Sequence, residues 1–191
     1  MKTRSTALAL AASLSTLLAA EGANAQSFFG TPYAHEARFN LELHGIVNYS
    51  FWGEAFSPGV GLRFQIPLLR NGFVRSVNNS VYLGIGLDAF FYTSWYRDPS
   101  TNFHGSLQVP IMLTWNFHLA PRFTLFLEAG VAPTFGFWNG YYDNCNANVG
   151  WCYLTPGAAI GGHVHFRAPA SYPAFTFRVG FPTGLTLGIT F

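Results

Sequence analysis

Apolar and polar residues alternate with a period of two over most of the chain, which is the pattern of β-strands with two unlike faces. Residues 183–191 show it most plainly: Leu185, Leu187, Ile189 and Phe191 share one face, and small or polar residues share the other. A soluble protein seldom carries such an exposed apolar strand, because an unpaired edge promotes aggregation. The pattern favours a strand that closes a barrel and turns its apolar face to lipid.

Seven further segments alternate in the same way, and eight such segments in series are strong evidence where one is weak. They cover residues 38–49, 60–68, 81–92, 107–117, 123–131, 153–166 and 175–179. Strands of about nine to eleven residues are expected, because that length crosses a bilayer at a tilt. The sequence therefore predicts an all-β fold, an eight-stranded antiparallel up-and-down transmembrane β-barrel over residues 38–191.

Composition separates this barrel from other classes of protein. The chain is 50% hydrophobic and 9% charged, whereas roughly a quarter of the residues of a soluble domain are charged. A secreted lipocalin-like carrier, also eight-stranded, would need more charge on its outside. Beyond residue 25 no apolar run is long enough for a transmembrane helix. That part of the chain has eight arginines and seven acidic residues, too even a balance for a nucleic-acid partner.

The first 25 residues have the organisation of a secretory signal peptide. Lys2 and Arg4 precede an apolar run over residues 7–20, and Ala23 and Ala25 supply the small residues of a cleavage site. A membrane-anchor helix is disfavoured because the run is too short. We therefore expect a signal peptide over residues 1–25 and an N-terminal periplasmic tail over residues 26–37.

Connection lengths predict the orientation, because barrels of the bacterial outer membrane have short periplasmic turns and longer outer loops. The predicted outer loops are residues 52–58, 93–106 and 138–152. The predicted periplasmic turns are residues 118–122 and 167–173. The connection over residues 69–80 is long for a periplasmic turn, and the last outer connection, near residues 181–184, is short.

With its signal peptide, alternating strands and final Phe191, the sequence resembles the small eight-stranded outer-membrane proteins of the OmpA-transmembrane-domain and OmpX-like superfamily. The resemblance covers about residues 38–191 and is one of architecture, without a motif that identifies a subfamily. It implies an integral protein of a Gram-negative outer membrane that contacts outer-membrane lipid. The final strand resembles the signal read by the barrel-assembly machinery, with Leu185, Leu187, Ile189 and Phe191 as its apolar positions.

Charged residues on the inward faces are the first candidates for a site. They are the acids Glu42, Asp88 and Glu128 and the arginines Arg63 and Arg178. Side chains fill the interior of an eight-stranded barrel, and buried charges must pair or cost several kcal/mol. The sequence thus predicts a lumenal ion-pair network, with its pairs left open, and a small gated pore is the alternative.

The only two cysteines, Cys145 and Cys152, lie in the predicted third outer loop. Export to an oxidising compartment favours a disulfide between them. It would stiffen the aromatic, asparagine-rich tip that begins at Trp138, a composition suited to binding an extracellular ligand. An uncommitted surface loop is the other interpretation.

Two groups of residues suggest chemistry only weakly. His163 and His165 share a strand face near His118, but spacing fixes no third metal ligand, so we expect lumenal histidines and neither a metal nor another cofactor. His104 and Ser106 resemble the His-x-Ser of the outer-membrane lipid A deacylases, which implies a base and a nucleophile. Both face the lumen by parity, and the asparagine expected after the serine is a leucine.

The sequence therefore predicts a non-enzymatic outer-membrane barrel with a structural or surface-interaction role through its outer loops. A deacylase-like lipid A hydrolase and a small gated pore are the alternatives.

Overall fold

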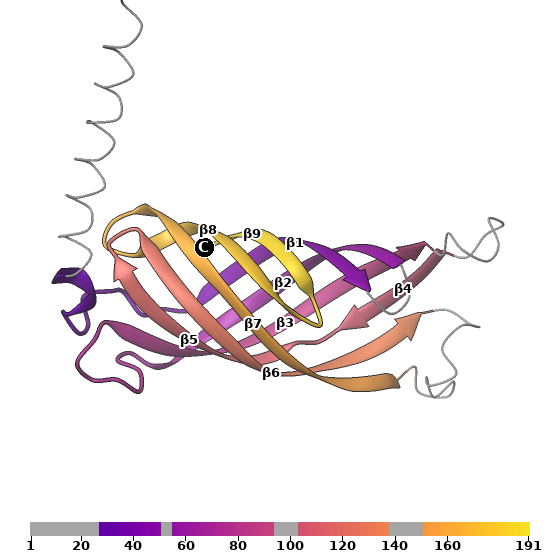
Figure 1. Cartoon of the computed structure of the whole chain (residues 1–191), viewed down its shortest axis with the longest axis horizontal. Helices are drawn as coiled ribbons and strands as arrows, with labels where there is room; N and C mark the ends of the chain where they lie inside the picture. The colour runs from indigo at the N-terminus through magenta and orange to yellow at the C-terminus, as the bar shows by residue number, and fades with distance from the viewer. Residues whose placement is uncertain (1–26, 51–54, 94–102, 138–150) are drawn as a thin grey trace, which may run out of the picture.

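Nine β-strands form one closed antiparallel sheet in the computed structural model, which describes residues 27–50, 55–93, 103–137 and 151–191 (Figure 1). They are β1 (Asn40–Ser50), β2 (Ala55–Leu69), β3 (Asn79–Thr93), β4 (Phe103–Gln108), β5 (Ile111–Ala120), β6 (Phe123–Phe137), β7 (Trp151–Arg167), β8 (Ser171–Phe181) and β9 (Gly184–Thr190). Apart from β4 and β5, strands that follow one another in the chain are neighbours, and β9 pairs with β1 to close the sheet. The predicted all-β, up-and-down barrel is confirmed.

The barrel has eight strand positions, because β4 and β5 lie end to end between β3 and β6. Asp88 pairs with Gln108 and Ile85 with Ile111, so the register continues across the gap without a shift. Pro110 lies in this gap and has no backbone N–H to give to the sheet. The two pieces are thus one barrel strand interrupted at a proline.

Most strands are longer than the sequence indicated. β2, β3 and β6 have 15 residues each and β7 has 17, so the expected nine to eleven was wrong for them. The ladder between β1 and β2 continues to the pair Ser50 and Ala55, beyond the last clearly alternating apolar residues. The three predicted outer loops are correspondingly shorter, because residues at the end of each belong to the strand that follows.

The two faces of the sheet have opposite polarity. Outward side chains are apolar and exposed: Leu43 is 50% accessible, Val60 59% and Val179 56%. Inward side chains are mostly polar or charged and nearly all buried, among them Glu42 and Arg178, both 0% accessible. The polar interior is what the period-two pattern predicted.

The two ends of the barrel differ. The end that we call the turn end carries the β2–β3, β5–β6 and β7–β8 connections, residues 70–78, 121–122 and 168–170. The opposite loop end carries the β1–β2, β3–β4 and β6–β7 connections, which include residues outside the described ranges, and the short β8–β9 turn (Figure 1). Phe191 lies at the turn end, where its backbone N–H donates to the Leu41 carbonyl at 2.8 Å.

Residues 27–39 pack against the turn end. The backbone N–H of Asn78 donates to the carbonyl of Phe29 at 2.7 Å, and the ring of His35 stacks on that of His118 with centroids 3.8 Å apart. Burial lowers the pKa of His35. Part of the predicted periplasmic tail therefore contacts the barrel, while the predicted signal peptide lies outside the described residues.

Candidate functional site

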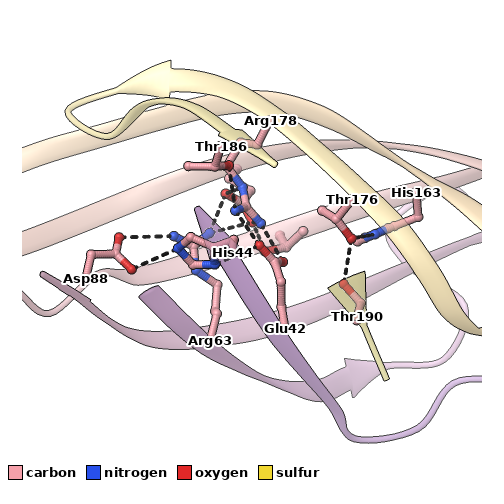
Figure 2. A network of polar contacts seen from close by, with 11 residues as sticks. Glu42, His44, Arg63, Asp88, His163, Thr176, Arg178, Thr186 and Thr190 are labelled. Carbon is pink, nitrogen blue, oxygen red and sulfur yellow. Dashed lines mark hydrogen bonds and ion pairs between the residues drawn. The ribbon is translucent and has the colours of Figure 1, made fainter. Parts of the chain in front are cut away.

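Arg178 of β8 is the centre of a buried cluster of charges in the lumen (Figure 2). Its Nη1 and Nη2 atoms donate to the two carboxylate oxygens of Glu42 on β1, at 2.8 and 3.0 Å. Its Nε atom lies 2.8 Å from Glu128 Oε2 on β6. A guanidinium presents its donors in a planar fork that matches carboxylates, so this side chain joins two acids from different sides of the barrel.

Arg63 of β2 binds the same Glu128 from the other side. Its Nη1 atom donates to Oε2 at 2.9 Å and to Oε1 at 3.2 Å. The hydroxyl of Thr114 on β5 donates to Glu128 Oε1 at 3.0 Å. Arg63 Nη2 also lies 4.0 Å from Asp88 Oδ2 on β3. Glu128 is therefore held by two guanidiniums and one hydroxyl.

His44 of β1 joins the remaining acids. Its Nδ1 atom lies 3.1 Å from Glu42 Oε1, and its Nε2 atom lies 3.0 Å from Asp88 Oδ1 (Figure 2). Only an imidazolium carries N–H on both ring nitrogens, so His44 would have to be protonated to donate to both carboxylates. With His44 protonated, three acids would face three cations.

Glycines provide the space that these contacts need. Gly61 of β2 lies between His44 and Asp88 in the strand pairing, and a Cβ added there would overlap the contacting atoms of both side chains. Gly161 of β7 likewise lies between two long side chains, because it pairs with Phe126 of β6 on one side and with Arg178 of β8 on the other. The ring of Phe126 lies over Gly161 and faces the Arg178 guanidinium. The distance from Arg178 Cζ to the centroid of the ring is 5.2 Å.

A second polar cluster lies nearer the turn end. His118 contacts Ser80 and Thr124 through its two ring nitrogens, both at 2.9 Å, and Thr124 also contacts His165 Nε2 at 2.9 Å. His163 contacts Thr176, which in turn contacts Thr190 (Figure 2). These imidazoles bind hydroxyls, and the part of the chain that the structure describes contains no group of His, Cys, Asp and Glu arranged to hold a metal.

All five residues of the predicted network, Glu42, Arg63, Asp88, Glu128 and Arg178, lie in the buried cluster. Sequence reasoning missed His44 as a member, although its parity placed it on the inward face of β1. It also missed the role of Gly61. An inward glycine between two long polar side chains of neighbouring strands is a signal that could have found this contact.

The other predicted residues are placed as follows. Ser106 of β4 is buried on the lumen face and pairs with Phe90 of β3. The side chain of His104 is outside the described residues, as is Cys145, so the disulfide with Cys152 stays a prediction. The four apolar residues of the predicted assembly signal lie on the outer face, between 40% and 52% accessible.

No family model and no curated protein matches this sequence. Among the described residues no helix is long and apolar enough to cross a membrane.

Proposed function

We propose that this chain is a non-enzymatic integral protein of a Gram-negative outer membrane, similar in build to the OmpA/OmpX-like proteins. Its role would be structural or one of surface interaction through the loop end. The observation that carries the proposal is the reversed polarity of the closed sheet, apolar outside and ion-paired inside. A closed barrel leaves no backbone edge unpaired, which is the condition for a sheet to lie in hydrocarbon.

The extent of the outer apolar surface supports a lipid environment. Large apolar side chains are exposed on strands all round the barrel, including Phe64, Leu113, Leu127, Ile160 and Leu187. Soluble monomers rarely expose a contiguous apolar patch larger than a few hundred Å². Burial in acyl chains removes this surface from water, so a membrane is the solvent that suits it.

Cell fractionation and gel migration test this proposal together. The protein is expected in the outer-membrane fraction, and an unheated sample should migrate differently from a heated one, because a closed barrel resists detergent until it is boiled. The heated aliquot of the same sample is the control. A soluble protein whose migration does not change on heating would contradict both the location and the membrane role.

The filled lumen argues against the pore. Arg63 and Arg178 are both 1% accessible or less, and both are held by carboxylates inside the barrel. Purified protein in planar bilayers should therefore give no discrete conductance steps, with heat-denatured protein as the blank. Regular steps whose size changes in Glu42→Gln would overturn this expectation and favour a channel.

The lipid A hydrolase finds little support in the residues it needs. Ser106 is 8% accessible and faces the lumen, whereas an enzyme that acts on a membrane lipid needs its nucleophile at the lipid face. Glu128, the nearest downstream carboxylate, is held by Arg63, Arg178 and Thr114. The role without catalysis is therefore the one that we propose.

A further inference from the structure

Five arginines lie at the turn end, in or next to the segments that connect the strands there. They are Arg38 before β1, Arg70 and Arg75 between β2 and β3, Arg122 between β5 and β6, and Arg167 at the end of β7. All five are exposed, and the only acid in the same connections is Glu36. We call these residues the arginine ring.

Each arginine of the ring follows or precedes a residue of the outer apolar surface. Phe39, Leu69, Val74 and Phe166 are the neighbours of Arg38, Arg70, Arg75 and Arg167, and they are between 39% and 55% accessible. Phe123 follows Arg122 in the same way. The cations therefore stand where the apolar surface of the barrel ends.

None of these five guanidiniums has an acidic partner among the described residues. Arg70, Arg75, Arg122 and Arg167 form no ion pair with any carboxylate of the described residues, unlike the two arginines of the lumen. Arg38 differs, because it donates to the Tyr172 carbonyl at 3.4 Å and lies over the Tyr172 ring. A set of unpaired cations beside an apolar surface suits an anionic partner that is itself next to hydrocarbon.

The sequence of the other three long connections has a net charge of the opposite sign. Three acids and one arginine, Glu54, Asp98, Asp143 and Arg97, belong by sequence to the connections of the loop end. The asymmetry lies in the connections and does not involve the lumenal charges. It distinguishes the turn end as the end that attracts anions.

We infer that the arginine ring binds the phosphates of anionic phospholipid headgroups in the leaflet at the turn end. Guanidinium forks bind phosphate through two N–H donors, and arginines reach from apolar surface to the headgroup level along their aliphatic stems. This inference rests on the proposed membrane location and adds a lipid partner to it. If the turn end is periplasmic, that leaflet is the inner leaflet of the outer membrane.

Lipid selectivity of the folded, full chain tests the inference. Wild-type protein in phosphatidylcholine vesicles is probed with trace spin-labelled phosphatidylglycerol or spin-labelled phosphatidylcholine, and the ratio of the two association constants is measured. Attraction of one basic side chain to an anionic surface corresponds to about a fivefold change in affinity. We expect a preference of several-fold for the anionic lipid, reduced strongly in 1 M salt, where the Debye length is about 3 Å.

Two quadruple variants separate the ring from other sources of selectivity. Arg70→Gln, Arg75→Gln, Arg122→Gln and Arg167→Gln combined should bring the ratio close to one, while the matched set of four Arg→Lys changes keeps the charge and most of the preference. Heat-dependent gel migration checks that both variants are folded. A wild-type ratio near one, or a preference that survives in the glutamine variant, would overturn the inference. A wild-type chain that does not insert into the vesicles at all would instead reject the proposed function.

Discussion

Arg178→Met is expected to lower the free energy of unfolding by about 3–5 kcal/mol, the usual cost of removing one partner from a buried ion pair. Arg178 binds both oxygens of Glu42 and also contacts Glu128, and all three side chains are almost fully inaccessible. Without the guanidinium, Glu42 keeps only His44, and Glu128 keeps Arg63 and Thr114. Urea titration in lipid vesicles, followed by tryptophan fluorescence and gel migration, measures the change.

Two further variants show whether unpaired charge causes the loss. Arg178→Lys keeps the charge but cannot donate to two carboxylates through a planar fork, so we expect an intermediate stability. Combining Arg178→Met with Glu42→Gln removes one acid together with the cation that binds it, which leaves the net charge of the cluster as in the wild type, and should recover part of the loss. Equal stability of Arg178→Met and the wild type would show that the cluster does not hold the barrel together.

The sequence determined which face of a strand each residue occupies, and this is why the members of the cluster could be named in advance. Period-two alternation follows from the strand backbone itself, so Glu42, Arg63 and Arg178 had to point inward once the outer face was recognised. Parity carries no information on height within the barrel. That height depends on the register between strands, which places Arg178 beside Glu42, 136 residues away in the chain.

Strand length was harder to predict than strand face for a related reason. Alternation is visible only where one face meets an apolar environment, and the ladder continues beyond that zone, as the pair Ser50 and Ala55 shows. The interruption at Pro110 is similarly invisible to a pattern of polarity, because Val109 and Ile111 keep the outward alternation on either side. Hydrogen bonding, and not side-chain polarity, defines these boundaries.

The second large effect concerns the contact between His44 and Asp88. This contact needs the space that Gly61 leaves because it has no side chain. Gly61→Ala should lower the free energy of unfolding by roughly 1.5–3 kcal/mol, the range for losing a hydrogen bond to a charged group. The new methyl group would occupy the space where His44 Nε2 meets Asp88 Oδ1 at 3.0 Å. Either side chain can move away, but then the buried Asp88 carboxylate keeps only its longer contact with Arg63, at 4.0 Å. Urea midpoints in vesicles measure the cost.

Gly45→Ala is the matched control, because Gly45 lies next to His44 on β1 but faces outward. A Cβ there meets nothing closer than the Leu187 carbonyl oxygen at 3.9 Å, so this change should leave stability nearly unaltered. In a His44→Ala background, Gly61→Ala should cost much less than in the wild type, because the contact that it breaks is already gone. Equal costs in the two backgrounds would mean that Gly61 serves the strand backbone, and that the bridge between His44 and Asp88 contributes little.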